Sequence, residues 1–280
     1  MMPGGPPTLL ASLCAALLLL APVPGVAGVV LRVSGTGSAL GAIRELVPAF
    51  EKAHPGVTVK LLPSVGSAGA IQAVRERALE VGISGRPLLP EEVAAGLLEV
   101  TYARTPFVFA VGPRVTATSL SAGELVRIYR GELTAWPDGE RIRPVLRPGA
   151  DVDTLTIRAI SPELDAAMEV ALGREGLLMA ATNQDCNEAL ARTPGSVGPT
   201  TLSQLKTEVH TLRPLAWNGV EPTVTSLASG AYPLAKALHA VVRAPVSAPV
   251  HRFLDFLGSA EARRILEQTG NLPAPAPARP

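Results

Sequence analysis

The chain has 280 residues, of which 47% are hydrophobic and 18% charged, and its formal net charge is +1. This composition is too apolar for an intrinsically disordered protein, and the length suits one large domain or two smaller ones. A net charge close to zero removes the usual electrostatic argument for binding nucleic acid or an anionic membrane surface.

The first segment has the pattern of an export signal. Residues 9–21 (LLASLCAALLLLA) form an uncharged apolar run, shorter than the roughly 20 residues that span a bilayer. Two prolines follow, and the small residues at 25–27 suit cleavage after Ala27. We therefore expect residues 1–27 to be a cleavable signal peptide and the protein to be periplasmic or otherwise extracytoplasmic. An uncleaved anchor is the alternative, because no Lys or Arg precedes the apolar run.

The next part of the chain alternates strands and helices. Apolar runs predict strands over 29–34, 57–62 and 81–84, and helical periodicity predicts helices over 38–51 and 70–79. This alternation is typical of an α/β fold with a mostly parallel sheet, in which ligands bind at the carboxyl ends of the strands.

The pattern changes in the second half. Ser121 and Glu124 match a capping box at the start of a helix over 121–129. The other predicted elements are strands over 107–111, 143–147, 212–217 and 237–242, helices over 165–172 and 252–269, and a short buried turn over 196–198. The chain ends in a Pro- and Ala-rich segment, and we expect residues 276–280 to be a disordered tail.

Three loops have residues suited to holding an anion. The loop 34–41 (SGTGSALG) joins a strand to a helix, where glycines allow close backbone approach and the helix N-terminus offers N–H groups. The loop 64–69 (SVGSAG) repeats this arrangement after the next strand. The loop 147–154 (RPGADVDT) places Arg147 at a strand end before a turn rich in Asp and Thr, which could clamp an oxyanion.

Each loop has other interpretations. The first resembles a dinucleotide-binding fingerprint, although the next strand ends at Leu62 without the acidic residue that such a site needs. The third partly matches the aspartate-nucleophile motif of phosphatases, D-x-D-x-[TV], although Leu155 stands at the fifth position. Tight turns without a ligand, or an exposed acidic turn at 151–153, are the simplest alternatives.

Other signs of catalysis or metal binding are missing from the sequence. The four histidines are scattered without metal-ligand spacing, and there is no G-x-S-x-G motif. After loss of the signal, Cys186 would be the only cysteine, so no intramolecular disulfide is expected. We expect no catalytic residue, no metal and no cofactor.

Seven segments in chain order resemble the periplasmic phosphate-binding proteins of ABC transporters, over nearly the whole chain after residue 27. The segments are SGTGS at 34–38, VGSAGA at 65–70, VGISGRPL at 81–88, IYRGELTAWPDG at 128–139, PGSVG at 194–198, YPLAKAL at 232–238 and FLDFLGSAEARRIL at 253–266. The resemblance implies a two-lobed type II periplasmic-binding-protein fold whose lobes close on the ligand about a hinge.

The resemblance also implies lobe boundaries. Lobe one would comprise residues 28–112 and 213–275, and lobe two residues 113–212. The chain would cross between the lobes at 107–111 and return near 213–217.

A set of ligand-binding residues is implied as well. They are Gly37, Ser38 and Ala39 in the first loop, Ser67 in the second, and Arg147 and Thr154 in lobe two.

Two departures from the family pattern concern the ligand. The family's phosphate binders carry an Asp after the G-x-S of the third strand, where this chain has Gly85 followed by Arg86. That Asp can accept the proton of hydrogen phosphate, which sulfate lacks, and Arg86 would instead add positive charge. The family's Ser-Gly-Thr turn is Asp-Val-Asp-Thr here, so Asp153 either supplies the missing acceptor or repels the anion. Arg86 and Asp153 complete the expected set of ligand-binding residues.

We therefore expect an exported, monomeric solute-binding protein that is not an enzyme. It would capture inorganic phosphate or a similar oxyanion between its lobes and deliver it to an ABC transporter permease. The alternatives are a sensor or protein-interaction relative of the same fold that transports no solute, and a phosphatase.

Overall fold

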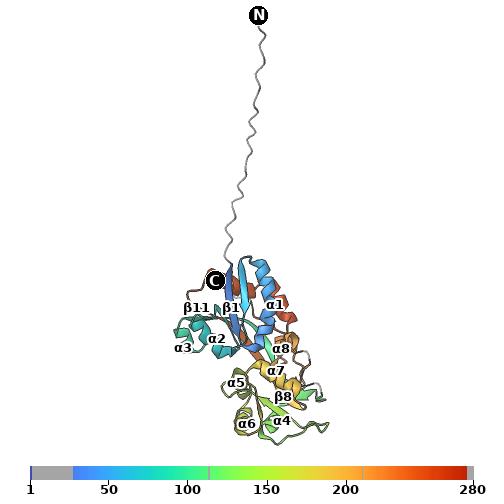
Figure 1. The fold of residues 1–280 in the computed structure, drawn as a ribbon. Coiled ribbons are helices and arrows are strands. Elements are labelled where there is room, and N and C mark those ends of the chain that lie inside the picture. Colours follow the sequence, from blue (N-terminus) through green and yellow to red (C-terminus); the bar gives the residue numbers. More distant parts are fainter. Residues whose placement is uncertain (2–27, 113, 210, 276–280) are drawn as a thin grey trace.

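The computed structural model describes Met1 and residues 28–112, 114–209 and 211–275 (Figure 1). The expected signal peptide after Met1 and the expected tail at 276–280 lie outside these residues. Within the described part of the chain, no helix combines the length and the apolar character needed to cross a membrane.

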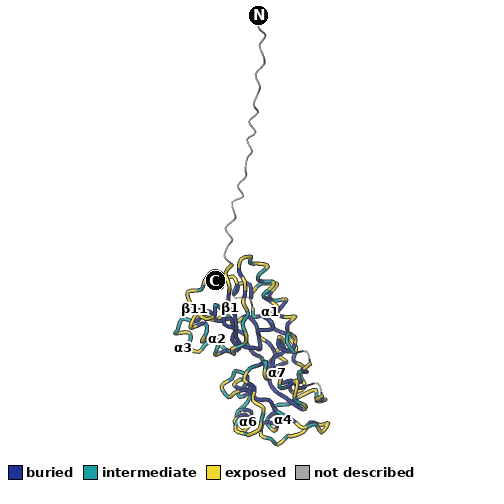
Figure 2. Tube along the Cα trace, in the orientation of Figure 1, coloured by how far each residue is buried: buried dark blue, intermediate teal, exposed yellow. Residues whose placement is uncertain are grey.

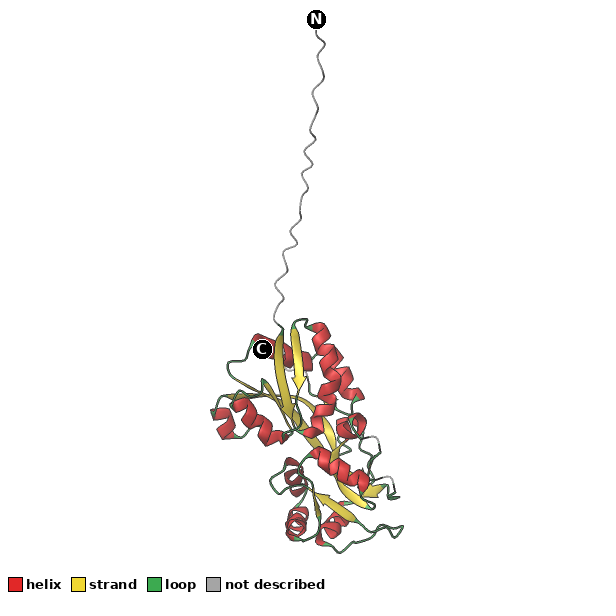
Figure 3. Cartoon of the chain, in the orientation of Figure 1, coloured by secondary structure: helices red, strands yellow, loops and turns green. Residues whose placement is uncertain are grey.

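Helices pack around a central sheet in both parts of the molecule (Figure 3). They are α1 (Gly37–Ala53), α2 (Gly66–Arg75), α3 (Pro90–Ala94), α4 (Ala122–Arg130), α5 (Val152–Arg158), α6 (Pro162–Gly173), α7 (Asn183–Arg192), α8 (Leu202–Thr207), α9 (Val224–Ala228), α10 (Ala248–Leu257) and α11 (Ala260–Gln268). The predicted capping box at α4 is confirmed, because Ser121 Oγ accepts from the N–H of Glu124 (3.2 Å) and the Glu124 carboxylate accepts from the N–H of Ser121 (2.7 Å).

The strands include one long strand, β4, that serves both parts of the molecule. They are β1 (Val29–Gly35), β2 (Val57–Leu61), β3 (Val81–Ser84), β4 (Leu97–Val111), β5 (Ser119–Leu120), β6 (Arg143–Leu146), β7 (Leu178–Met179), β8 (Ser196–Thr201), β9 (Arg213–Pro214), β10 (Ala216–Trp217), β11 (Ala235–Arg243) and β12 (Leu272–Pro273). The first part of β4 pairs with β11, and its last part, Phe107–Val111, pairs with β8.

The main sheet has the strand order β2-β1-β3-β11-β4-β8-β6-β7. The outer groups β2-β1-β3 and β8-β6-β7 are parallel, and for the first group this agrees with the prediction from the alternation of strands and helices over residues 29–84. The central strands β11 and β4 are antiparallel to their neighbours, so the sheet is mixed. The candidate ligand loops, which follow β1, β2 and β6, therefore lie on either side of this central junction.

Buried residues lie in both parts of the molecule (Figure 2), and their hydrophobic side chains form separate clusters. One cluster packs α1, α10 and α11 against β1, β3 and β11. Within it, the rings of Phe50 and Phe253 meet edge to face, with their centroids 5.1 Å apart. Another packs α4, α6 and α7 against β6, β8 and the end of β4. We call the part around the first cluster lobe one and the part around the second cluster lobe two. Two separate cores are what a two-lobed fold requires.

Some predicted elements are wrong in type or extent. Residues 196–198 belong to strand β8, and all six of its residues are buried, so it shows no alternating pattern. The single helix expected over 252–269 is two helices, because Gly258 ends α10 and the Ser259 hydroxyl caps the start of α11. The expected turn after Arg147 begins helix α5, with Asp151 as its N-cap.

The segment 213–234 packs with lobe two. Trp217 stacks on Phe109 with ring centroids 5.4 Å apart, and the Tyr232 hydroxyl donates to the carbonyl of Phe107 (2.9 Å). The lobe boundaries remain a prediction. We propose that the chain returns to lobe one at Ala235, where β11 begins, rather than at 213.

Candidate anion-binding site

The first loop follows β1 and leads directly into α1. The Thr36 and Ser38 hydroxyls, both buried, are in hydrogen-bond contact at 2.8 Å. Packing dictates glycine at Gly35, where a Cβ would lie 2.0 Å from the carbonyl oxygen of Ile83. The N–H of Ala39 donates to the carbonyl of Thr36 (3.1 Å), so it is already engaged. The hydroxyls of Thr36 and Ser38 are therefore the side-chain groups that this loop offers to a ligand, and one of the two donates to the other.

The second loop is tied to the first. The Ser64 hydroxyl donates to the carbonyl of Gly35 (2.9 Å), and the Ser34 hydroxyl donates to the carbonyl of Pro63 (2.5 Å). In the first turn of α2, Ser67 Oγ accepts the N–H of Gly85 (2.9 Å). Because that oxygen accepts here, the Ser67 hydroxyl keeps its own proton to donate.

The third loop places a buried arginine at the end of β6. The side chain of Arg147 is only 3% exposed, with Nη1 donating to the carbonyl of Ala180 (2.7 Å) and Nη2 to Asp151 (2.7 Å). Its Nε has no hydrogen-bond partner among the described residues and lies 3.8 Å from Oδ2 of Asp153. The Thr154 hydroxyl donates to the carbonyl of Arg147 (3.0 Å), so Thr154 positions the arginine.

Asp153 is the centre of the cluster. Its carboxylate is about 1% exposed, so the interpretation as an exposed acidic turn is wrong. Oδ1 forms an ion pair with Nζ of Lys236, and Oδ2 accepts from Nδ2 of Asn183 (2.6 Å). Thr36 Oγ1 in turn lies 3.4 Å from Oδ1 of Asn183. A continuous polar network thus connects the first loop of lobe one to α7 and α5 of lobe two.

Sequence reasoning missed Lys236 and Asn183. Lys236 lies within YPLAKAL, one of the segments that carry the family resemblance, but just before the strand predicted over 237–242, and the sequence alone assigns it no role. The signal that could have singled it out is a lysine between two apolar residues, Ala235 and Ala237, in strand β11. Asn183 is the first residue of α7 and gives no such signal, because Asn is common at helix ends.

The structure does not bring Arg86 into this network. Its guanidinium makes two hydrogen bonds with the carboxylate of Glu92 on α3 (2.8 and 2.7 Å). Hydrogen bonding to Arg86 lowers the pKa of Glu92. The positive charge of Arg86 is therefore matched locally, and the interpretation of this residue as a ligand-binding group is not supported by the geometry.

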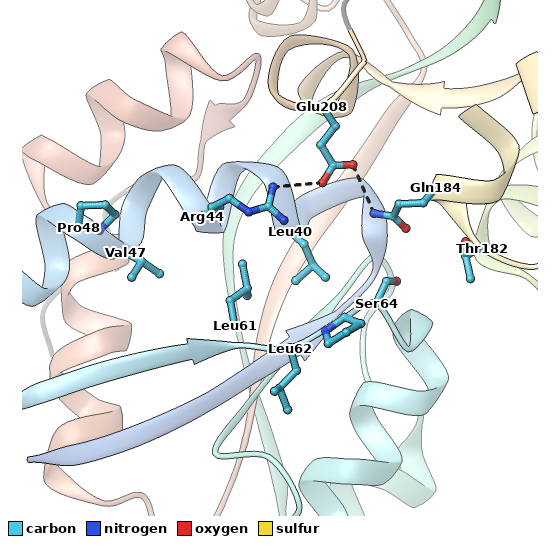
Figure 4. Close-up of a pocket in the computed structure, with 11 residues that line it drawn as sticks. Leu40, Arg44, Val47, Pro48, Leu61, Leu62, Ser64, Thr182, Gln184 and Glu208 are labelled. Carbon is cyan, nitrogen blue, oxygen red and sulfur yellow. Dashed lines mark hydrogen bonds and ion pairs between the residues drawn. The ribbon is translucent and has the colours of Figure 1, made fainter. Parts of the chain in front are cut away.

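A separate cavity of about 730 Å³ lies beside the first loop (Figure 4). Its walls are mostly apolar side chains of α1 and the end of β2, among them Leu40, Val47 and Leu61. At its rim the Glu208 carboxylate lies 3.7 Å from Arg44 and accepts from Gln184 (3.3 Å). An inorganic anion would find few donors there, so we place the candidate site at the buried network instead.

Comparison with known proteins identifies the family. Residues 22–261 match the model of the PBP superfamily domain. The phosphate-binding protein PstS of Borreliella burgdorferi is 23% identical over 251 residues, covering 87% of this chain and 89% of that protein. PstS of Bacillus subtilis is 24% identical over 252 residues, covering 87% and 80%. These relatives are binding proteins and not enzymes, so the phosphatase alternative finds no support among them.

Solved structures show the same fold. A phosphate ABC transporter substrate-binding protein from Clostridium perfringens, with bound phosphate, has a TM-score of 0.75 at 20% identity and covers 88% of this chain and 100% of its own. The reduced form of OxyR from N. meningitidis has a TM-score of 0.58 at 13% identity, covering 89% and 100%. The chain therefore belongs to the PBP superfamily, with a type II periplasmic-binding-protein fold and distant homology to the PstS proteins.

Proposed function

We propose that this chain is an exported solute-binding protein that captures inorganic phosphate, or a similar oxyanion, between its lobes and delivers it to an ABC transporter permease. The observation that carries the proposal is the buried polar network. Through it, Ser38 of lobe one is connected to Arg147 of lobe two by way of Thr36, Asn183 and Asp153. The PstS relatives and the pattern of residues 1–27 support the transport role and the export.

The proposed ligand contacts are local donors. They are the N–H groups of Gly37 and Ser38, the hydroxyls of Ser38 and Ser67, and Nε of Arg147. Helix N-termini and hydroxyls bind oxyanions without a large net positive charge, which fits a chain of net charge +1. Ala39 and Thr154 shape the two loops, and Arg86 is left out because Glu92 already holds its guanidinium.

Calorimetric titration of the purified protein with phosphate, sulfate, molybdate and tungstate tests the proposal. We expect saturable binding of at least one anion, and a rise in melting temperature that follows RT ln(1 + [L]/Kd). Absence of both binding heat and melting shift with all four anions would overturn it.

A specific observation favours one second candidate, a sensor or protein-interaction relative that transports no solute. Asp153 and Asp151 already match the charges of Lys236 and Arg147 in the network. If the chain is such a sensor or interaction protein, no anion would change its melting temperature. A defined protein partner would then bind to the purified chain with a measurable dissociation constant.

A further inference from the structure

The surroundings of Asp153 resemble those of a bound anion. Among the described residues, its two side-chain oxygens lie beside an ammonium, an amide donor and a guanidinium nitrogen, which come from three different parts of the chain. Nζ of Lys236 comes from β11, Nδ2 of Asn183 from α7, and Nε of Arg147 from the end of β6. The carboxylate thus takes up the charge and hydrogen bonds that an incoming oxyanion would seek at the same place.

The ion pair between Asp153 and Lys236 connects the two lobes. Lys236 stands in β11 opposite Thr105 of β4, in the sheet of lobe one. Asp153 lies in the first turn of α5, whose buried Ile157 packs in the core of lobe two. Both charged side chains are almost fully buried, at 2% and 1% exposure. A buried charge without its partner is costly, so the pair favours the arrangement in which the lobes meet.

Residue 85 and Lys236 belong to the same arrangement. A Cβ on Gly85 would lie 2.6 Å from Cε of Lys236, a separation that real Cβ atoms essentially never show. A side chain at position 85 would therefore require Cε of Lys236 to move from its place beside Asp153. Lys236 thus occupies the space that an acidic side chain at position 85 would need, and it pairs with Asp153 instead.

From these contacts we infer that Asp153 is an internal anion that holds the lobes together without a ligand, and that Lys236 is a further ligand-binding residue. An inorganic oxyanion would bind by displacing the Asp153 carboxylate from Lys236 and Arg147. The displacement step rests on the proposed function, whereas the closure without a ligand does not. When the oxyanion replaces the Asp153 carboxylate, Lys236 and Arg147 still face a negative charge. Binding therefore does not require a site with a net positive charge.

The test measures lobe closure and anion binding separately. Fluorescent labels at Lys60→Cys on β2 and Glu169→Cys on α6, in a Cys14→Ser background, report the distance between the lobes. In buffer without phosphate or sulfate, the protein with intact Asp153 should stay in the short-distance state. Asp153→Asn should shift the population to longer distances, and saturating phosphate should reverse the shift.

Matched variants make the result specific. Glu140→Gln removes another carboxylate that pairs with an arginine, Arg143, outside the network and away from both labels, and should leave the label distance unchanged. Lys236→Met breaks the same ion pair from the other side, so it should also open the lobes, which guards against a fold defect in Asp153→Asn alone. Asp153→Asn should bind phosphate about tenfold more tightly than the wild type, as expected when a competing charged contact is removed, and Lys236→Met should not.

Two outcomes would overturn the inference. One is an unchanged label distance in both Asp153→Asn and Lys236→Met without an anion. The other is weaker phosphate binding in Asp153→Asn, which would make Asp153 an acceptor for the ligand. If the variants open but no oxyanion binds to any of them, the internal closure stands and the proposed function fails.

Discussion

The aliphatic chain of Lys236 fills the space that a side chain on Gly85 would need, with Cε 2.6 Å from the position of a Cβ. Gly85 directly follows β3, and Lys236 belongs to β11, so both residues lie in lobe one. The same lysine forms an ion pair with Asp153 of lobe two. A side chain at position 85 would therefore require the end of the Lys236 side chain to shift.

Gly85→Ala should therefore destabilise the protein by about 1–3 kcal/mol, the usual cost of overpacking. Urea denaturation measures this free energy of unfolding. Combining Gly85→Ala with Lys236→Ala should remove most of the cost, because the methyl group then finds room.

Gly123→Ala is the matched control. Nothing lies within 4 Å of a Cβ at Gly123 in α4, so this change should not destabilise. A loss of less than about 0.5 kcal/mol for Gly85→Ala, similar to an ordinary surface change, would contradict the packing of Lys236 described here.

Arg147→Lys should weaken phosphate binding by about tenfold or more, because a lysine keeps the charge but loses the planar fork. In the wild type, that fork donates to Ala180 and Asp151 while Nε faces Asp153. Calorimetric titration measures the affinity, and near-wild-type phosphate binding by Arg147→Lys would speak against a ligand contact by Nε.

Arg86→Ala provides the contrast. Because its guanidinium is held by Glu92, removing it should change the phosphate affinity by no more than about twofold, within the small range of a pair outside the site. A large loss of affinity in Arg86→Ala would return this residue to the ligand-binding set.

Glu92 should contribute to stability above the pKa of an unfolded glutamate, about 4.3. Hydrogen bonding to Arg86 lowers the pKa of Glu92 in the folded state, so this stabilisation is lost as the pH falls through the folded pKa. The difference in unfolding free energy between the wild type and Glu92→Gln should therefore shrink as the pH is lowered from about 6 to about 3. A difference that stays constant, or grows, over this range would contradict the assignment.

Cys186 should be unreactive in the folded protein. The side chain is buried in the core of lobe two, and burial raises the pKa of its thiol to about 12, with Asp153 adding to the effect. In a Cys14→Ser chain at pH 8, a thiol reagent should modify Cys186 only after unfolding in guanidinium. Rapid modification of the folded chain would show that this part of the core opens readily.

Much of the site could be predicted because its signals are local. Glycine and serine runs directly after apolar strands identified the loops of Ser38 and Ser67, and an arginine at a strand end identified Arg147. The ion pair of Asp153 with Lys236 could not be predicted, since 83 residues separate the partners and their contact depends on how the two lobes meet.

In the fold, too, features with a local sequence pattern could be predicted and features that depend on distant contacts could not. The alternation of strands and helices predicted the parallel part of lobe one, where each element has its own periodic pattern. Strand β8 was missed because its sequence, SVGPTT, is neither a continuous apolar run nor an alternating pattern, and the long β4 was underestimated because its first half is partly exposed and polar. The antiparallel centre of the sheet is set by tertiary pairing of β4 with β11, which no local pattern records.

The most direct test is a crystal structure of the chain grown with phosphate. We expect a phosphate held by Ser38, Ser67, Arg147 and Lys236, with the Asp153 carboxylate displaced from Lys236. An intact Asp153–Lys236 ion pair at saturating phosphate, with no anion between the lobes, would contradict it.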